Sequence, residues 1–378
     1  MPGDMQQLNV KSKAGDYEVV VGRGAWSAFR SFPAADYSST FVLTEENIWR
    51  HWQRKFLSET RLKRRQTLFV APGERSKELP VLARLASEML DRGADRHSLL
   101  ILLGGGVAGD LGGFLASTYM RGIDYVNCPT TVLSQVDSAI GGKTAVNLGK
   151  AKNLVGSFYP PRLVLADSQV LTSLPPRDLR SGLYEVVKHA ILDGPELFAQ
   201  LERCIGKVNP QNIEDFEPLV VRAAKVKVDV VNKDEREKRL RFALNLGHTF
   251  GHALEEATGY RRFLHGEAVG WGLLAVTRLA ERLHTIDPGA ATRIRNLILQ
   301  LGPLPGLTRI DPSAVVRLLS KDKKTIGGRI HWVIPEKIGK VRITTDVPAS
   351  AAAAAFRDLL AESRQFSGAP RNGRGRLE

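Results

Sequence analysis

Residues 99–110 read Leu-Leu-Ile-Leu-Leu-Gly-Gly-Gly-Val-Ala-Gly-Asp, an apolar run that leads directly into a glycine turn and then a helical stretch. A buried strand, a glycine turn and a helix start can bind phosphate, because backbone N–H groups face outward there and the helix dipole favours anions. The spacing matches neither the G-x-G-x-x-G pattern nor a Walker loop, since no G-K-[ST] follows. Because such a turn often serves only packing, the loop by itself is modest evidence for a nucleotide-binding site.

The first half of the chain alternates apolar, β-rich runs with helix-length segments, which predicts βαβ units and a parallel sheet. The helical spacing is clearest at residues 79–92, where apolar side chains recur at intervals of three and four. The expected strands are Tyr17–Val21, Phe41–Thr44, Thr67–Ala71, Leu99–Leu103, Tyr125–Cys128 and Leu163–Ala166.

From about Pro175 onward, long amphipathic helical stretches dominate. We expect helices at Leu179–Leu192, Glu217–Lys233, Leu240–Ala257, Glu267–Leu283 and Ser350–Glu362, and a strand pair at Ile330–Val333 and Val341–Thr344. The expected architecture is an α/β nucleotide-binding domain with a parallel sheet at residues 1–172 and a mainly α-helical metal-binding domain at 173–366. A disordered basic tail is expected at 367–378.

Length and composition exclude several classes of protein. The 378 residues suggest two domains, and 43% hydrophobic with 25% charged residues rules out wholesale disorder. No apolar run reaches the ~18 residues of a membrane span, and the N-terminus lacks the apolar core of a signal peptide. The two cysteines, Cys128 and Cys204, form no CxxC pair. We therefore expect a cytoplasmic enzyme without disulfides.

The formal net charge of +14 is the one unusual number in the composition. The basic clusters at residues 61–65 and 371–376 are short and carry no interleaved aromatic residues, which argues against nucleic acid or a membrane surface as the partner. Most of the excess is expected to be solvated surface charge. An acidic small substrate remains compatible with it.

Three of the eight histidines lie within residues 248–265. His248 and His252 are four apart and so share a helix face, while His265 begins the next helical stretch. Glu185 lies on a third stretch. Two histidines and a carboxylate with an open fourth position are typical of a catalytic zinc site. The metalloprotease pattern H-E-x-x-H is absent, since residue 249 is Thr.

Several basic residues lie in surroundings that suit a small polyanion better than solvent. They are Arg121, Lys143, Lys152 with its neighbour Asn153, Lys188 and Arg241. Each one alone is more often a surface residue, but together they could bind a phosphorylated substrate through charge-assisted hydrogen bonds. A further turn, Pro72–Lys77, could direct Glu74 to ribose hydroxyls, or could be an ordinary βα turn.

These motifs, taken in order, resemble the 3-dehydroquinate synthase family from about Tyr17 to Pro348. The residues that carry the resemblance are Gly104–Asp110, Pro129–Thr131, Gln135–Ser138, Gly141–Lys143, Lys152-Asn153, Glu185–Lys188, Asp234–Lys238, Asn245–His252 and His265–Glu267. The resemblance implies a dehydroquinate synthase-like fold and a homodimeric, NAD-dependent lyase that requires zinc or cobalt. It also implies a place in the shikimate pathway, where 3-deoxy-D-arabino-heptulosonate 7-phosphate is converted to 3-dehydroquinate and phosphate.

The resemblance also implies roles for individual residues. The metal ligands would be Glu185, His248 and His265. The NAD contacts would be Asn47, Glu74, Lys77, Gly105, Gly106, Val107, Asp110, Thr130, Thr131, Lys143, Lys152, Val170 and Ser173. The substrate and catalytic residues would be Asp137, Lys143, Lys188, Lys227, Arg241, Asn245, His252, Asn153, Lys324 and, from a dimer partner, Arg121.

Within that set, Lys227, Arg241 and Asn245 would take the substrate carboxylate, and Lys152, Asn153, His252 and Lys324 would surround the phosphate. The family chemistry is a transient oxidation by NAD, β-elimination of phosphate, reduction, ring opening and an intramolecular aldol closure, with no net oxidation.

Three alternatives remain. A related cyclase of the epi-valiolone synthase type would use a sugar phosphate without the carboxylate and need not keep the residues that bind it. A metal-dependent polyol dehydrogenase would release NADH and have little use for so many phosphate-binding groups. A catalytically inactive scaffold protein would not be expected to keep a complete set of metal ligands.

Overall fold

The computed structural model describes residues 5–63, 65–149, 151–319 and 330–366. Lys324 and the basic tail at 367–378 lie outside the described residues. The chain forms two compact units: Met1–His189 with Lys207–Arg241, and Ala190–Gly206 with Phe242–Glu378. These units divide the chain elsewhere than at the expected 172/173 boundary, which stays a prediction.

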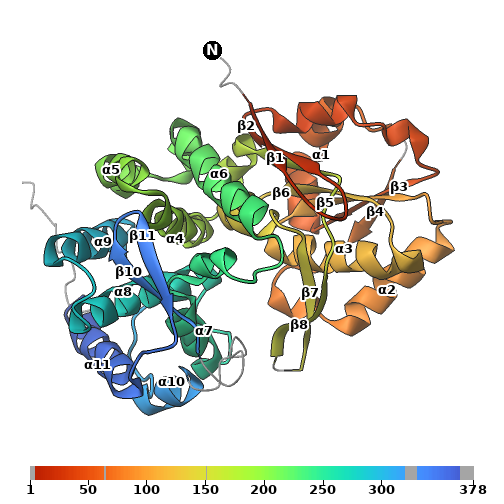
Figure 1. Cartoon of the computed structure of the whole chain (residues 1–378). Helices are drawn as coiled ribbons and strands as arrows, with labels where there is room; N and C mark the ends of the chain where they lie inside the picture. The colour runs from red at the N-terminus through yellow and green to blue at the C-terminus, as the bar shows by residue number, and fades with distance from the viewer. Residues whose placement is uncertain (1–4, 64, 150, 320–329, 367–378) are drawn as a thin grey trace, which may run out of the picture. The chain divides into compact units, whose positions relative to one another are not determined.

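The first unit is built on a seven-stranded sheet in the order β1-β2-β9-β6-β5-β3-β4 (Figure 1). β1 pairs antiparallel with β2, and every other neighbouring pair in this sheet is parallel. The strands are β1 (Gln6–Val10), β2 (Tyr17–Gly22), β3 (Thr40–Thr44), β4 (Gln66–Phe69), β5 (Leu99–Gly104), β6 (Tyr125–Pro129) and β9 (Leu163–Asp167). The predicted fold class, with a parallel sheet in the N-terminal half and helices in the C-terminal half, is confirmed. The antiparallel strand β1 was not predicted.

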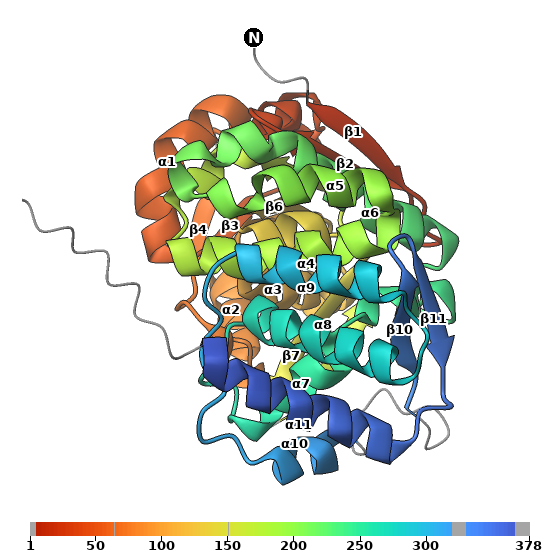
Figure 2. The same ribbon diagram turned by 90° about the vertical axis from the view of Figure 1, so that its left-hand side faces the viewer.

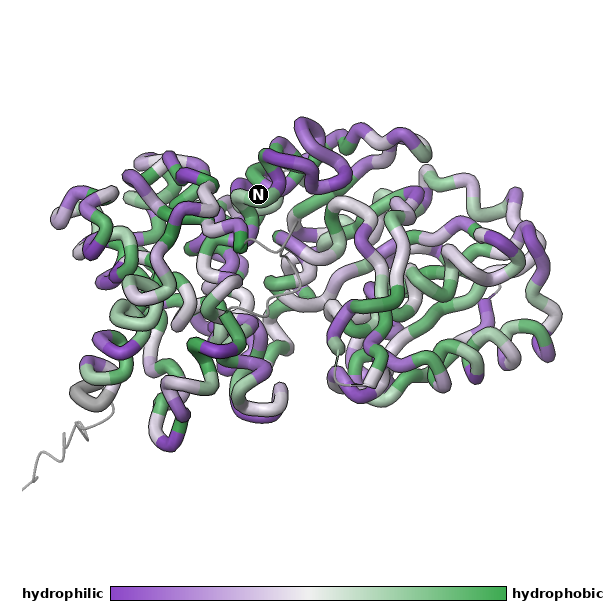
Figure 3. The backbone as a smooth tube through the Cα atoms, turned by 60° about the horizontal axis from the view of Figure 1, so that its bottom comes forward, coloured by the Kyte–Doolittle hydropathy of each residue, from purple (hydrophilic) through white to green (hydrophobic). Residues whose placement is uncertain are grey.

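Helices α1 (Glu46–Thr60), α2 (Leu79–Asp91) and α3 (Gly106–Thr118) connect parallel strands of the sheet. Helix α6 (Glu217–Lys233) follows the last strand of the sheet and packs against it, since both faces of a parallel sheet are normally covered. One core packs α2 and α3 against β3, β5 and β6, and another packs α6 against β1, β2 and β9. Figure 3 shows helices striped in purple and green, as expected for segments that bury one face.

The chain order reverses between β3 and β5, since β4 lies outside β3 and β6 lies on the other side of β5. In open α/β sheets, ligands bind at the carboxyl ends of the strands at such a switch point. The glycine loop follows β5 at this point. A separate hairpin of β7 (Lys143–Leu148) and β8 (Ala151–Phe158) packs against α3.

Helices make up most of the second unit, with α8 at its centre (Figure 2). Its elements are α5 (Pro195–Cys204), α7 (His248–Ala257), α8 (His265–Arg282), α9 (Pro288–Gln300), α10 (Pro312–Leu319), α11 (Ala349–Phe366) and the hairpin β10 (Trp332–Lys337) with β11 (Lys340–Thr344). Helix α4 (Pro176–Asp193) runs across the division between the units.

Short 3-10 turns and one π turn connect these elements at residues 25–31, 34–36, 74–76, 119–121, 134–138, 168–173, 205–207, 210–216 and 240–245. Among the described residues, we find no helix with both the length and the apolar character needed to cross a membrane.

One expected helix is wrong in its extent. Residues 240–257 were expected to be continuous, but the turn Leu240–Asn245 ends before α7 begins at His248. The interruption is at Gly247, which has φ +78, a left-handed conformation that favours glycine. A Cβ on Gly247 would also lie 2.9 Å from the backbone nitrogen of Leu273. The break therefore places His248 at the first residue of a helix.

Candidate active site

The glycine loop joins β5 to the N-terminus of α3. Thr130 N donates to the carbonyl of Gly104 at 3.0 Å, and a Cβ on Gly105 would lie 3.1 Å from Thr131 Cγ2. The loop after β6 is therefore packed against the loop after β5. Gly105, Gly106, Val107, Thr130 and Thr131, all predicted NAD contacts, come together at one edge of the sheet, where the N–H groups of the first turn of α3 favour an anion.

A polar cluster connects this loop to the hairpin. Lys77 Nζ lies 2.5 Å from Asp110 Oδ2, and Asn147 Nδ2 donates to Glu74 Oε1 at 2.9 Å. Burial raises the pKa of Asp110, and the Lys77 ammonium opposes that rise. The predicted residues Glu74, Lys77 and Asp110 are thus neighbours. Asn147 on β7 was missed, because nothing in the sequence shows that the hairpin folds back onto the 74–76 turn.

The predicted adenosine-side contacts lie near α1. Asn47 is exposed in the first turn of this helix. Ser173 Oγ accepts a hydrogen bond from Trp52 Nε1 at 2.9 Å, which connects the 168–173 turn to α1. The side chain of Val170 is buried in the core, so only its backbone can meet a ligand.

A buried ionic cluster in the first unit centres on Asp137, from the turn at 134–138. Lys188 Nζ donates to Asp137 Oδ2 at 2.9 Å, and Lys227 Nζ donates to Oδ1. Lys188 also lies 2.5 Å from Glu185, one turn earlier on α4. The structure therefore brings together four residues from three segments that are distant in sequence.

The charges in this cluster shift one another. Burial acts to raise the pKa of Asp137, but Lys188 and Lys227 outweigh it and hold that pKa well below its usual range. Burial acts to lower the pKa of Lys188, but Asp137 and Glu185 raise it above its usual value. For Lys227, burial dominates over the attraction of Asp137 and lowers the pKa to about 8.

Arg241 lies beside this cluster and is 1% exposed. Its guanidinium donates to the carbonyls of Gly141, at 3.2 and 3.3 Å, and Glu235. Gly141 has φ +100, and a Cβ there would lie 2.3 Å from Arg241 Nη2. The glycine is therefore required both by the backbone conformation and by the space that the guanidinium fills.

Lys143 and Glu237 form an ion pair. Partial desolvation lowers the pKa of Lys143, whose side chain is still 46% exposed, and Glu237 counteracts this. Glu237 is the second residue that was missed as a site residue, although the 234–238 segment was identified as a motif. Glu237 has a φ of +55, which is unusual for a glutamate. This backbone conformation can be seen only in the structure, so the sequence did not indicate it.

Three of the predicted polar residues lie toward the surface of the first unit. Arg121 and Asn153 are exposed, with φ +72 and +50, and Lys152 is half-buried. Asn153 N donates to Asn147 Oδ1 at 2.9 Å, which places it beside the Glu74 cluster. Lys324, predicted to bind phosphate, is outside the described residues.

In the second unit, three imidazole rings gather at the start of α7 and α8. The ring centroid of His248 lies 5.4 Å from that of His252 and 5.3 Å from that of His265. Glu267 fixes the start of α8, because its carboxylate accepts a hydrogen bond from Leu264 N at 2.8 Å. The turn of sequence His265-Gly-Glu267 therefore holds His265 at the first helical residue. Asn245, at the end of the preceding 3-10 turn, is half-buried.

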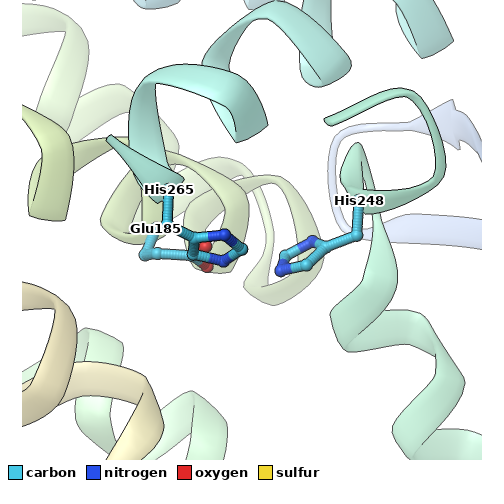
Figure 4. A group of neighbouring side chains, drawn as sticks. All are labelled: Glu185, His248 and His265. Carbon is cyan, nitrogen blue, oxygen red and sulfur yellow. The ribbon is translucent and has the colours of Figure 1, made fainter. Parts of the chain in front are cut away.

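Figure 4 shows the rings of His248 and His265 pointing toward one another, with Glu185 from α4. The ligand atoms of these three residues lie within 4.8 Å of one another. Two imidazole nitrogens and a carboxylate oxygen suit zinc or cobalt. His248 Nδ1 is 3.2 Å from the carbonyl of Leu246, which can only accept, so Nε2 is left to bind an ion. The residues present fit a divalent metal.

A second group with metal-ligand spacing, Asp137, Glu185 and His189, lies wholly in the first unit. Lys188 and Lys227 already donate to Asp137, so two ammonium groups stand where a cation would bind. Burial and then the Lys188 charge lower the pKa of His189 well below its usual value. We therefore assign no metal to this group.

Comparison with known structures first defines the class. A 2-epi-5-epi-valiolone synthase from Streptomyces hygroscopicus subsp. jinggangensis 5008, solved with NAD⁺ and Zn²⁺, superposes with a TM-score of 0.83 at 26% identity, covering 93% of this chain and 99% of that one. A 2-deoxy-scyllo-inosose synthase complexed with carbaglucose-6-phosphate, NAD⁺ and Co²⁺ has a TM-score of 0.81 at 24% identity, covering 94% of this chain and 99% of that one. The chain has the fold of these sugar-phosphate cyclases.

Sequence comparison then defines the family. The family models for the 3-dehydroquinate synthase N-terminal and C-terminal parts match residues 67–181 and 182–325. The 3-dehydroquinate synthase of Koribacter versatilis (strain Ellin345) is 41% identical over 362 residues, which are 94% of this chain and 98% of that protein. The chain belongs to the 3-dehydroquinate synthase family, as its motifs predicted.

Proposed function

We propose that the chain is a 3-dehydroquinate synthase that converts 3-deoxy-D-arabino-heptulosonate 7-phosphate to 3-dehydroquinate and inorganic phosphate, with NAD and zinc or cobalt as cofactors. The reaction is a carbon–oxygen lyase reaction with no net oxidation, because the hydride that leaves the substrate returns to it. Both cysteines are free thiols, which suits a reducing compartment such as the cytoplasm.

The observation that carries the proposal is the buried cationic cluster of the first unit. Lys188, Lys227 and Arg241 are 0%, 7% and 1% exposed. Burying a cation is costly unless an anion compensates it. Lys188 and Lys227 share the carboxylate of Asp137, and Arg241 donates to the neutral carbonyls of Gly141 and Glu235. A substrate with a carboxylate would supply a further anion beside Lys227 and Arg241. We propose that Lys227 and Arg241, with Asn245 of the second unit, hold the substrate carboxylate.

The other proposed roles follow from the metal-binding atoms or hydrogen-bonding groups that each residue carries. Glu185, His248 and His265 are the proposed metal ligands. Lys152, Asn153, His252 and Lys324 are the proposed phosphate contacts. The glycine loop, the Glu74–Lys77–Asp110 cluster, Thr130, Thr131, Lys143 and the 170–173 stretch are the proposed contacts to NAD, with Asn47 near the adenosine.

When bound, NAD supplies a reversible hydride acceptor and the metal polarises the hydroxyl that is oxidised. The chain itself orients the substrate and excludes water. Asp137 and Lys188 form a buried hydrogen-bonded pair that can hold a proton near the reacting hydroxyl. The phosphate contacts fix the leaving group, and the substrate's own phosphate oxygen is the proposed acceptor of the proton lost in the elimination.

The direct test measures phosphate release. Purified protein with NAD and zinc is expected to release inorganic phosphate from the heptulosonate phosphate without lasting absorbance from NADH. A chelator should abolish the release, and added zinc or cobalt should restore it. Sustained NADH formation would instead identify a polyol dehydrogenase, and failure to release phosphate would refute the proposal.

The related cyclase is the second candidate, because the fold is shared. A seven-carbon sugar phosphate without the carboxylate distinguishes the two functions. If the protein turns over this substrate faster than the heptulosonate phosphate, the carboxylate assignment of Lys227 and Arg241 is wrong.

We also propose a homodimer. Large apolar side chains are exposed on the β7–β8 hairpin and beside Arg121: Leu148, Leu154, Phe158 and Met120 are 43–53% exposed. Exposed apolar patches commonly mark protein interfaces. If Arg121 acts in the partner's site, Arg121→Ala and His248→Ala should each be inactive alone. When the two proteins are dissociated and mixed, half of the dimers contain one subunit of each kind, and each such dimer has one complete site out of two. The mixture should therefore recover about a quarter of wild-type activity. No recovery would refute this role.

A further inference from the structure

The second unit holds a buried acidic residue, Glu255 of α7, that sequence reasoning did not single out; it is 2% exposed. We propose that Glu255 is a positioning residue for the metal site: it accepts a hydrogen bond from Nδ1 of His265 and thereby directs Nε2 of that ring to the metal ion. The inference rests on the proposed function, because it takes His265 as a metal ligand.

The geometry determines which nitrogen carries the proton. Glu255 Oε2 lies 3.3 Å from His265 Nδ1. A carboxylate has acceptor oxygens only, so the ring nitrogen must be the donor. In the neutral ring, Nε2 then carries the lone pair that a metal needs. Glu255 thus selects one of the two tautomers of His265.

The other histidine ligand has the same arrangement. His248 Nδ1 lies 3.2 Å from the Leu246 carbonyl oxygen, which likewise only accepts. Both rings therefore keep Nε2 for the metal and use Nδ1 for a hydrogen bond within the protein. The difference is that the partner of His265 is charged, and it raises the basicity of the ring as well as orienting it.

Helix packing explains why Glu255 can reach His265. His248, His252 and Glu255 occupy positions i, i+4 and i+7 and share one face of α7. This face lies close to α8 because glycines line the contact: a Cβ on Gly272 would be 1.9 Å from the Gly247 carbonyl oxygen. Any larger residue there would separate the helices and lengthen the Glu255–His265 hydrogen bond.

Burial strengthens the interaction. The Glu255 side chain is 3% exposed, while that of His265 is 33% exposed. A hydrogen bond to a desolvated carboxylate is stronger than one in water. The His265 ring also contacts the rings of His248 and His252, with centroids 5.3 and 5.9 Å apart, but the Glu255 carboxylate is the partner that distinguishes one ring nitrogen from the other.

Glu255 could instead bind an ion directly, because His252, Glu255 and His265 also have ligand atoms within 4.8 Å of one another. The two roles differ in how much metal affinity the carboxylate supplies. Loss of an orienting partner typically costs 10–100-fold in metal affinity, whereas loss of a ligand removes a bond to the ion. Metal titration can therefore distinguish them.

The experiment compares wild type, Glu255→Leu and the control Glu256→Leu. Leucine has a similar size to glutamate but offers no acceptor, whereas the amide oxygen of a glutamine could still accept from Nδ1 of His265. Glu256 is the next residue on α7, is exposed, and undergoes the same chemical change. Zinc affinity is measured on the metal-free proteins by competition with a chromophoric chelator. We expect Glu255→Leu to bind zinc about 10–100-fold more weakly than wild type, and Glu256→Leu to bind it like wild type.

Two results would overturn the inference. Equal zinc affinity of Glu255→Leu and Glu256→Leu would show that Glu255 positions nothing. A loss as complete as that of His265→Ala would make Glu255 a ligand. If wild type and Glu256→Leu themselves bind no zinc, or release no phosphate, it is the proposed function that fails.

A measurement on the zinc-loaded wild-type protein tests the same point without relying on a variant that folds. Long-range ¹H–¹⁵N spectra of histidine side chains report which ring nitrogen is protonated, and the His265 signal is assigned from its absence in His265→Gln. We expect a proton on Nδ1 and zinc on Nε2. Zinc on Nδ1 would contradict the proposal.

Discussion

Gly141→Ala should weaken the reaction by displacing Arg241. A Cβ at residue 141 would lie 2.3 Å from Arg241 Nη2 and 2.9 Å from its Cζ, at a backbone φ of +100. An ordinary contact needs at least about 3.4 Å, so the guanidinium must move by about 1 Å. The backbone itself adds about 1–3 kcal/mol of strain.

The effect on activity can be calculated in two ways. A displacement of about 1 Å in a substrate-positioning group can cost about 10²-fold in rate. Loss of one hydrogen bond to a charged group costs about 1.5–3 kcal/mol, which corresponds to about 10–150-fold. We therefore expect kcat/KM for the heptulosonate phosphate to fall by about 10²-fold, mostly through KM, since a carboxylate contact is made in both ground and transition states.

The control is Gly93→Ala, in the turn after α2. Gly93 has φ +81, but a Cβ there would meet nothing within 4 Å. This variant carries the backbone strain without the displaced arginine. Phosphate release is measured at saturating NAD and zinc with two substrates, the heptulosonate phosphate and a seven-carbon sugar phosphate that lacks the carboxylate. Activity of Gly141→Ala within twofold of Gly93→Ala would refute the role of Arg241, as would an equal loss on both substrates.

Three further outcomes are expected. Lys227, with a pKa of about 8, is protonated below that pH and binds the carboxylate there, so kcat/KM should fall as pH rises through about 8; a flat profile to pH 10 would contradict this. Asp137→Asn removes the negative charge that compensates the buried Lys188 and Lys227 and should lower the free energy of unfolding by about 3–5 kcal/mol in urea denaturation, so an unchanged midpoint would be inconsistent with a buried ion pair. Gly112→Ala places a Cβ 2.2 Å from Leu102 and should cost about 1–3 kcal/mol of stability and weaken NAD binding, whereas Gly93→Ala should leave NAD binding unchanged.

The regular elements could be predicted because their causes are local. The strands that become β3, β5 and β6 are apolar runs bounded by turns, and residues 217–233 form one helix with the predicted ends. The exception at residues 240–257 has a cause that periodicity does not detect. Gly247 adopts a left-handed conformation, and a Cβ there would meet Leu273 of α8, a residue that is distant in sequence.

The identity of many site residues could be inferred from motifs, but their interactions could not. Asp137, Lys188 and Lys227 were each predicted, and only the structure shows that both lysines donate to the one carboxylate. Asn147, Glu237 and Glu255 were not predicted, because an isolated Asn or Glu carries no signal until a partner is near it. Their partners are supplied by the hairpin, the 234–238 segment and the close packing of α7 on α8.

Residue type and order along the chain were sufficient for the fold class and the family, because both depend on patterns that are written in consecutive residues. The perturbed pKa of Lys227, the glycine requirement at residue 141 and the tautomer of His265 depend on atoms that meet only after folding. Charge, space and hydrogen bonding act over a few ångströms, and the sequence does not state which residues come within that distance. The tertiary structure decided these properties for that reason.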